Sequence, residues 1–238
     1  MNRLSLLAVL PLLMLSACGG GGGGGAGSAG APQSQESKAF VAPVQGEKRV
    51  FTMTYYNVDG STATTNFYET ITQVNADASY TGYWTVDDYV FEGNHFGNDP
   101  WSDTYNSVGD VITQAIVTGI SCNYTFPSGG RPATMQPGQT WDDSNVAKCN
   151  VNNSSGSTTI QGTYLGIESV TVPAGTFSAY KFQTKQALIN STYVVTDWYN
   201  TSPTDSRLVR ELAQFDFNSG YTPPAQATSY QDMRLVSY

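Results

Sequence analysis

The sequence predicts an all-β protein whose antiparallel strands form one curved sheet. After the first 45 residues, short segments rich in Tyr, Thr, Val and Phe alternate polar with apolar positions, and Asn, Asp, Gly and Pro interrupt them about every ten residues. No long stretch repeats its apolar residues with the period of a helix. Since an antiparallel sheet of about ten strands has to curl, we expect an open or half-closed barrel, with a β-sandwich as the alternative.

The individual strands follow from the same alternation. The clearest hairpin joins residues 50–58 to a strand that begins at Ser61, because Asp59 and Gly60 provide the positive backbone angles of a two-residue turn. Pro173 and Gly175 are typical of a second tight turn between strands. The other expected strands are residues 78–86, 110–118, 120–126, 158–165, 168–172, 177–189, 192–200, 207–217 and 228–236.

The N-terminus has the pattern of an export signal. Arg3 precedes an apolar run at residues 4–15, which is too short to span a bilayer about 30 Å thick but fits the core of a signal peptide. Leu-Ser-Ala-Cys at 15–18 resembles the lipobox of bacterial lipoproteins. That resemblance implies cleavage before Cys18 and acylation of Cys18, which would anchor the protein to a membrane. The alternative is an ordinary secretory signal in which Cys18 has no role.

The residue after the cysteine indicates which of the two membranes carries the protein. By analogy with the lipoprotein family, an Asp at this position keeps the protein at the inner membrane, and this chain has Gly19 instead. We therefore expect the outer membrane as its location.

The chain is expected to divide into three parts. Residues 1–17 form the signal peptide. Residues 18–45 contain the lipidated cysteine and a flexible linker of Gly, Ala and Ser that begins with an unbroken glycine tract at 19–25. Residues 46–238 are long enough to bury a full core as a single all-β domain.

The charge balance argues against nucleic acid as a partner. The full chain carries 11 basic and 19 acidic residues, and loss of Arg3 with the signal peptide leaves 10 against 19, a net charge of −9. Such a charge repels nucleic acid and anionic lipid surfaces. Only 13% of the residues are charged, whereas Tyr, Thr, Ser and Asn abound, which is typical of exported β-rich domains.

Cys122 and Cys149 are the two cysteines that remain when Cys18 is lipidated. In an oxidising periplasm two such thiols are expected to form a disulfide. A metal site or a nucleophile is the alternative, but the cysteines lack Cys-x-x-Cys spacing and His95 is the single histidine.

No residue pattern predicts a catalytic site. His95 is not accompanied by a Gly-x-Ser-x-Gly elbow. The acid pairs at 87–88 and 142–143 are neighbours whose side chains point to opposite faces of a strand, so we expect them in turns and in solvent. Acidic and amide residues between 92 and 103 are candidates for calcium, yet their spacing does not match an EF-hand loop. We therefore expect no catalytic residues, no metal and no cofactor.

Aromatic residues are the remaining functional signal, with 15 Tyr and 4 Trp in the chain. They are concentrated between residues 80 and 101. Alternate residues of a strand face the core, so part of this set packs inside, and the rest is available to stack on sugars or contact a protein. If the chain has a ligand or partner surface, we expect it at Tyr80, Tyr83, Trp84, Tyr89 and Trp101.

The C-terminal half resembles a family of bacterial secreted and lipoprotein β-domains called TapB-like. The matching residues are Pro-Gly-Gln-Thr-Trp at 137–141, Thr-Val-Pro-Ala-Gly-Thr-Phe at 171–177 and Thr-Asp-Trp-Tyr at 196–199. Family members have a Gly-containing turn where this chain has Pro-Thr-Asp-Ser at 203–206. The resemblance implies an all-β envelope domain and provides no established catalytic residues.

Two function classes follow. The first is a non-enzymatic envelope lipoprotein that acts as a structural module or binds an apolar ligand, a glycan or another envelope protein. The alternative is a surface carbohydrate-binding or hydrolytic protein that uses a dispersed pair of carboxylates. An open apolar interior would favour the first class, and two acids facing each other in a cleft would favour the enzyme.

Overall fold

In a computed structural model of the chain, one closed antiparallel barrel contains most of the described residues. The structure describes residues 36–37, 40–87, 89–91, 94–96, 100–116, 120–127, 130–150, 155–188, 190–225 and 227–238. The signal peptide, Cys18 and the glycine tract lie outside these ranges. The barrel strands are β1 (Lys48–Asn57), β2 (Thr62–Val74), β3 (Tyr80–Val86), β6 (Trp101–Tyr105), β7 (Val111–Ile116), β8 (Ile120–Thr125), β9 (Thr140–Cys149), β10 (Ser155–Val172), β11 (Gly175–Ala187), β12 (Ser191–Asn200), β13 (Leu208–Phe217) and β14 (Thr228–Ser237).

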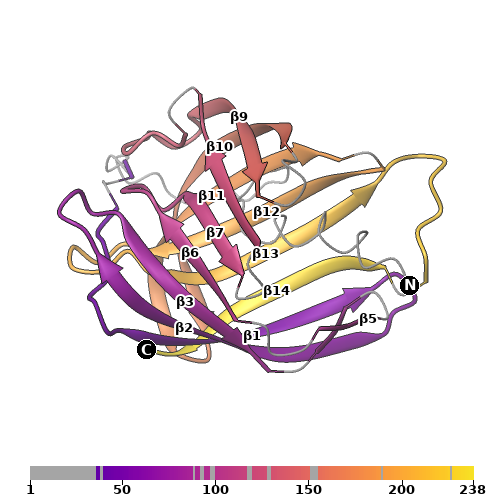
Figure 1. Cartoon of the computed structure of the whole chain (residues 1–238), viewed down its shortest axis with the longest axis horizontal. Helices are drawn as coiled ribbons and strands as arrows, with labels where there is room; N and C mark the ends of the chain where they lie inside the picture. The colour runs from indigo at the N-terminus through magenta and orange to yellow at the C-terminus, as the bar shows by residue number, and fades with distance from the viewer. Residues whose placement is uncertain are drawn as a thin grey trace, which may run out of the picture.

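The strands follow one another around the barrel in chain order (Figure 1). Pairing of β1 with β14 closes the ring. Between β3 and β6, β4 (Tyr89–Phe91) and β5 (Asn94–Phe96) form a separate two-stranded sheet. The predicted all-β class and the curved antiparallel sheet are confirmed, and no helix occurs in the described ranges. The sheet closes completely, whereas an open or half-closed barrel was expected.

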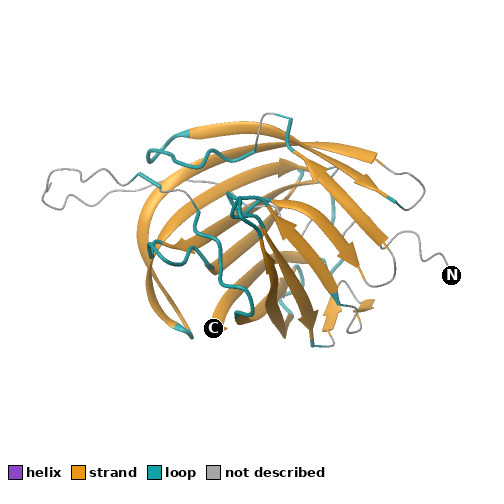
Figure 2. Cartoon of the chain, turned by 60° about the vertical axis from the view of Figure 1, so that its left-hand side comes forward, coloured by secondary structure: helices purple, strands orange, loops and turns teal. Residues whose placement is uncertain are grey.

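Closure has a simple physical reason. An open sheet leaves unpaired N–H and C=O groups on its two edge strands, and pairing the first strand with the last satisfies both edges at once. The wall is uneven, because β6, β7 and β8 have five or six residues whereas β11 to β14 have 10 to 13. Figure 2 shows the long strands wrapping around the interior.

Alternation along the strands separates the interior from the outer surface. In β1, Arg49, Phe51, Met53 and Tyr55 are buried, and the residues between them are less buried. The main apolar core forms from such inward positions on β1, β2, β3 and the C-terminal strands, among them Phe51, Trp84 and Leu235. Thus one side of each strand packs the interior.

The β1–β2 turn differs from the expected two-residue turn. The backbone N–H of Asn57 donates to the Ser61 carbonyl, and the N–H of Gly60 donates to the Asn57 carbonyl, which makes a three-residue loop. Within this loop only Gly60 has a positive φ, of 83°. The Asp59 carboxylate accepts the Ser61 N–H at 2.8 Å. The hairpin was therefore predicted correctly, but its turn is a type I turn followed by a left-handed glycine.

The strand predictions need correction in two respects. Two expected strands at 158–165 and 168–172 are one strand, β10, whose pairing shifts between Tyr164 and Gly166. Strands β4, β5, β6 and β9 were missed. Two of them carry acids at buried positions, Asp103 in β6 and Asp143 in β9, and these acids interrupt the polar and apolar alternation that marks a strand.

The last part of the expected linker packs on the barrel. The Ser37 N–H donates to the Met135 carbonyl, and the Ser37 hydroxyl accepts the Met135 N–H, both at 2.8 Å. The ring of Phe40 lies 6.2 Å from that of Tyr80 and 5.7 Å from that of Tyr199. Packing thus begins before the expected domain start at residue 46.

Candidate functional site

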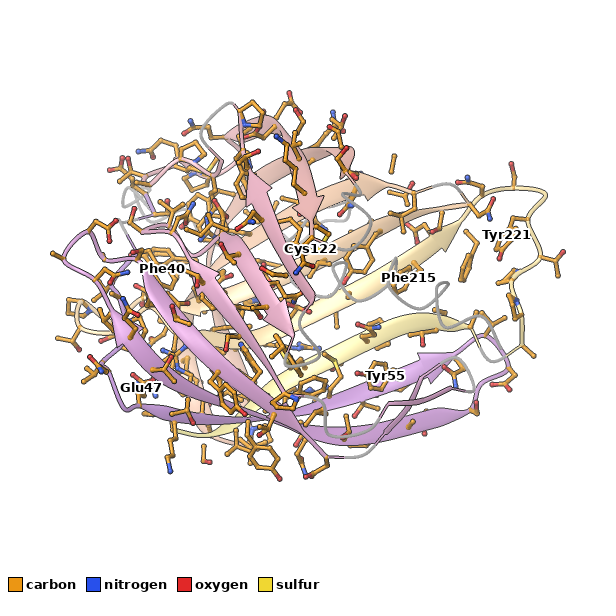
Figure 3. The ribbon with its side chains drawn as sticks, viewed as in Figure 1. Phe40, Glu47, Tyr55, Cys122, Phe215 and Tyr221 are labelled. Carbon is orange, nitrogen blue, oxygen red and sulfur yellow. A yellow bond between two sulfur atoms is a disulfide. The ribbon has the colours of Figure 1, made fainter. Side chains whose placement is uncertain are left out.

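The expected disulfide is present. The Sγ atoms of Cys122 and Cys149 are bonded and join β8 to β9, where the two residues lie directly opposite each other in the sheet. Figure 3 shows Cys122 in the middle of the molecule. The prediction from the cysteine count is confirmed.

The expected lipid attachment site lies outside the described residues. Cys18 belongs to residues 1–35, so its acylation stays a prediction. Among the residues whose placement is described, the chain contains no helix with the length and apolar character required to cross a bilayer.

The expected aromatic surface is divided between the core and the outer face. Tyr80 and Trp84 are 4% and 3% exposed, because alternate positions of β3 face the interior. The Tyr80 ring stacks on Tyr105 with 4.5 Å between centroids, and the Trp84 ring lies parallel to Trp101 at 5.9 Å. Tyr83 lies on the outer face and is exposed.

These aromatic residues therefore do not share one surface. Tyr80 and Trp84 are core residues, which corrects their assignment to an exposed surface. Trp101 is partly buried and packs against the same core. The side chain of Tyr89 lies outside the described residues.

Asp103 is fully buried beneath this aromatic group. Its carboxylate accepts the Trp101 Nε1–H at 2.9 Å and the Gln114 Nε2–H at 3.1 Å. Burial raises the pKa of Asp103 to about 7, and the two hydrogen bonds counteract part of that rise. Of the residues considered for calcium, Asp103 is the one whose side chain is described, and over the described ranges no group of three or more metal-ligating side chains comes together.

We expect Asp103 to make stability fall as the pH rises. Between the unfolded pKa of about 3.9 and the folded value of about 7, the folded state holds a proton that the unfolded chain has released. The free energy of unfolding should therefore decrease by up to about 1.4 kcal/mol per pH unit across this window. Urea unfolding of the wild type and of Asp103→Asn at several pH values measures the effect. Equal slopes for the two proteins would contradict it.

A second buried charge group joins β1 and β2. The Arg49 guanidinium donates from Nε to Glu47 Oε1 at 2.7 Å and from Nη1 to Glu69 Oε2 at 3.1 Å. A Cβ atom at Gly82 would lie 2.4 Å from Glu69 Oε1, so the glycine leaves room for this carboxylate. Burial raises the pKa of Glu69, and Arg49 counteracts part of that rise. The group is a compensated ion pair with a structural role.

The described acids of the two pairs occupy two different environments. Asp87 is exposed and accepts hydrogen bonds from Asn66 and Tyr68, and Asp142 is also exposed. Asp143 is buried and accepts the Gly130 N–H at 2.7 Å. Asp143 is thus not the solvent residue expected, because the alternation of β9 turns it inward. Asp88 and the His95 side chain lie outside the described residues.

A pair of carboxylates in the C-terminal strands was not anticipated as a site. Asp197 of β12 lies directly opposite Glu211 of β13, and both are buried, at 1% and 5% exposure. Side chains opposite each other on neighbouring strands have Cβ atoms about 4.5–5.5 Å apart. Part of the signal was in the sequence, because both acids lie inside segments predicted to be strands. The alternation was not clear at Asp197, since its neighbours Thr196 and Trp198 are buried as well.

Three polar side chains surround this pair. Tyr193 of β12 lies four residues before Asp197 on the same face, and Tyr55 of β1 lies opposite Gln231 of β14. Gln231 in turn lies opposite Ala213, two residues along β13 from Glu211 on the same face. We call Tyr55, Tyr193, Asp197, Glu211 and Gln231 the interior polar cluster.

Two members of the interior polar cluster hold buried polar atoms without a hydrogen-bond partner among the described residues. These atoms are the Tyr193 hydroxyl oxygen and the amide nitrogen and oxygen of the Gln231 side chain, and each residue is 1% exposed. Gln186, which lies opposite Tyr193 on β11, has an unpartnered Oε1. Native proteins keep few such atoms, and each one calls for a water, an ion or a ligand as its explanation.

Burial and nearby like charges raise the pKa values of Glu211 and Tyr193 in the interior polar cluster. Burial and the neighbouring Asp197 raise the pKa of Glu211 well above its usual value. Burial, with Glu211 and Asp197 nearby, also raises the pKa of Tyr193. Two carboxylates this close in a buried site cannot both ionise cheaply, so we expect them to share a proton near neutral pH.

The cluster lies away from the end where the linker packs. Figure 3 shows Tyr55 and Phe215 toward one end of the barrel, and Phe40 and Glu47 toward the other. The Phe215 ring lies 4.7 Å from the Tyr193 ring, so an aromatic wall borders the polar atoms. Val195 and Ala213 fill the sheet between Tyr193 and Gln231.

A small pocket lies at the linker end. The guanidinium of Arg131 lies over the rings of Phe182 and Tyr199, at 4.5 and 5.0 Å from their centroids, and Phe40 lines the same pocket. Its charge is partly balanced by Asp110, whose Oδ2 accepts the Arg131 backbone N–H. Aromatic faces and this carboxylate stabilise the cation, while the Arg131 Nη1 is buried without a hydrogen-bond partner among the described residues.

Comparison with known proteins finds similarity in structure only. No family model matches the sequence, and no curated protein matches it. The resemblance to TapB-like domains therefore stays a prediction.

Three solved structures are similar to this chain. One is a Bacteroides fragilis protein described as exported and as having a YmcC-like fold, with a TM-score of 0.45 and 14% identity over 84% of this chain and 98% of that one. Another is YmcC of Escherichia coli, described as a hypothetical lipoprotein, with a TM-score of 0.41 and 12% identity over 79% and 84%. The third, from Parabacteroides distasonis, is described as a lipoprotein, with a TM-score of 0.44 and 13% identity over 84% and 98%.

Proposed function

We propose that this chain is an outer-membrane lipoprotein, anchored through Cys18, whose barrel binds a small ligand at the interior polar cluster without chemical change. The membrane part of the proposal is supported by the lipobox-like residues 15–18, the glycine tract after them and the low fraction of charged residues, 13% of the chain. The binding part is supported by one observation above all: the Gln231 amide is 1% exposed and has no partner for either polar atom among the described residues.

The number of strands supports a ligand inside the barrel. The diameter of a barrel grows with the number of strands, and eight strands already enclose a space that side chains just fill. This barrel has twelve strands. Each unpartnered buried polar group costs about 1–3 kcal/mol, so retention of Tyr193 and Gln231 inside the wall is costly unless something hydrogen-bonds to them. A bound ligand with polar groups removes that cost.

Asp197 and Glu211 are also the observation that favours a hydrolytic alternative. The two carboxylates of a retaining glycosidase lie about 5–5.5 Å apart, which is compatible with neighbouring strands. Such enzymes, however, place the two groups on either side of the scissile bond, whereas these acids project from one wall and are buried. Binding therefore fits the arrangement better than hydrolysis.

We expect Cys18→Ser to abolish membrane anchoring. In cells fed labelled palmitate, the wild-type protein should incorporate label and sediment with the outer membrane, because the acyl chains on Cys18 are the anchor. The variant should carry no label and appear in the soluble fraction of the envelope or the medium. Cys122→Ser is the matched control for loss of a cysteine, and its labelling should equal that of the wild type. A labelled Cys18→Ser protein would refute the anchor.

We expect Gln231→Leu to stabilise the ligand-free protein by about 1–3 kcal/mol, because it removes two unpartnered buried polar atoms without changing the volume much. Gln114→Leu is the matched control, since Gln114 is similarly buried but donates to Asp103 at 3.1 Å. That variant should be destabilised. Urea unfolding of both purified variants measures the difference, and a destabilised Gln231→Leu would show that the amide has a structural partner.

The small molecules retained by the protein test binding directly. Wild type and Gln231→Leu are purified from the cell envelope under native conditions, denatured, and their released small molecules compared by mass spectrometry. We expect a species that is enriched with the wild type and depleted with the variant. Identical small-molecule content in the two samples would refute ligand binding at the interior polar cluster.

A further inference from the structure

The interior polar cluster has the charge and hydrogen-bonding character of a cation site. The buried acid Glu69, toward the other end of the barrel, has its own cation, because it pairs with Arg49 at 3.1 Å. For Glu211, no Lys or Arg within the described ranges forms an ion pair. The nearby Arg210 of β13 lies on the opposite face of its strand and pairs with Asp232. Thus Glu69 has a basic partner inside the barrel, whereas Glu211 has no basic partner in the described wall.

The neutral groups of the interior polar cluster also favour a cation. Gln231 Oε1 and the Tyr193 hydroxyl oxygen are buried acceptors without partners in the described part of the chain. The rings of Tyr193 and Phe215 pack against each other with 4.7 Å between centroids, and aromatic rings next to a cation stabilise it. An ammonium group has three donors and no acceptor. It would be satisfied by the Glu211 carboxylate, an amide oxygen and a phenol oxygen together.

We propose that the ligand of the interior polar cluster is a small organic molecule with a protonated amine, held by the Glu211 carboxylate with Gln231 and Tyr193 as neutral acceptors. This inference rests on the proposed binding function and adds the chemical class of the ligand. An aromatic or aliphatic body next to the amine would pack on Phe215 and Val195. A carboxylate or phosphate ligand would face two acids and no basic side chain of the described cluster.

Binding of a cation is coupled to the proton on Glu211. The titratable groups near Glu211 are Asp197 and Tyr193 on β12, and Tyr55 of β1 in turn lies near Tyr193. Strand β14 contributes Gln231 and Met233, which do not titrate. In the ligand-free protein, burial and Asp197 keep a proton on this pair. An ammonium favours the ionised pair, so its binding releases that proton to solvent. Affinity for the amine should therefore increase as the pH rises, by up to about tenfold per unit below the pKa of Glu211.

The test uses the full mature chain and three probes of similar size with one phenyl ring each: benzylammonium, benzyl alcohol and benzoate. We expect titration calorimetry to detect benzylammonium binding and at least about tenfold weaker binding of the other two. Repeating the titration in two buffers of different ionisation enthalpy should show proton release with the wild type. Glu211→Gln should weaken benzylammonium binding by about tenfold or more and abolish the proton release. Asp216→Asn, which removes an exposed acid of the same strand, should change neither.

Each other outcome overturns the inference. If benzyl alcohol or benzoate binds as tightly as benzylammonium, the site binds ligands but is not selective for amines, and the proposed function survives. If calcium alone binds and depends on Glu211, the site is a metal site. If none of the three probes binds, the amine assignment fails, and the small-molecule content of the purified protein decides separately whether the barrel binds a ligand.

Discussion

Replacing Arg49 with methionine is expected to lower the free energy of unfolding by about 3–5 kcal/mol. The Arg49 side chain is 3% exposed and bridges Glu47 and Glu69, whose carboxylates lie 2.7 and 3.1 Å from its nitrogens. Its removal leaves the Glu69 carboxylate buried without a cation. Urea unfolding at neutral pH measures the loss, with the denaturant slope as a check that the folded states remain comparable.

The double variant Arg49→Met with Glu69→Leu separates the ion pair from packing. Replacement of both members of a buried pair by apolar side chains of similar size is often neutral, so most of the lost stability should return. The single variant should also regain stability as the pH falls, because burial raises the pKa of Glu69 and protonation removes its charge. A double variant as unstable as Arg49→Met would mean that packing of the arginine methylene groups, rather than the ion pair, stabilises the contact between β1 and β2.

Removal of the disulfide by Cys122→Ser with Cys149→Ser is expected to cost about 3–4 kcal/mol of unfolding free energy, because the bond closes a loop of 27 residues in the unfolded chain. It also connects β8 to β9 in the wall where the strands are short. Urea midpoints of the wild type and the double variant provide the measurement. Reduction of the wild type should lower its midpoint to that of the variant, whereas reductant should leave the variant unchanged.

A smaller loss would have a specific meaning. If the double variant loses less than about 1 kcal/mol, the unfolded chain already holds these two strands close together, and the loop entropy assumed for it is too large. Non-reducing electrophoresis of the wild type is the accompanying control, since it reports whether the bond has formed in the sample used.

The elements that could be predicted from the sequence are the ones set by local patterns. The hairpin at Asp59 and Gly60 was predicted because a turn residue lies between two alternating runs. The disulfide was predicted because two cysteines remain after the lipobox. The predicted two-residue turn was wrong, because an Asp-Gly pair suits several turns and the loop length depends on how β1 and β2 pair.

Two of the missed strands carry buried polar residues. β6 contains Asp103 and β9 contains Asp143, and in each case the acid occupies an inward position that alternation assigns to an apolar side chain. The same reason hides the interior polar cluster. Asp197 and Glu211 lie 14 residues apart in the chain, and only the register of β12 on β13 brings them opposite each other.

By itself the sequence determined the all-β class, the lipoprotein-like leader and the cysteine pair, since each depends on residue spacing within a short stretch of chain. Only the tertiary structure decided that the sheet closes, that Tyr80 and Trp84 pack inside, and that Tyr55 of β1 meets Gln231 of β14. Those outcomes depend on strand pairing between residues as much as 187 positions apart, as in the pair Val50 and Ser237. Alternation says which residues share a face of one strand, but the register between strands decides which of them meet.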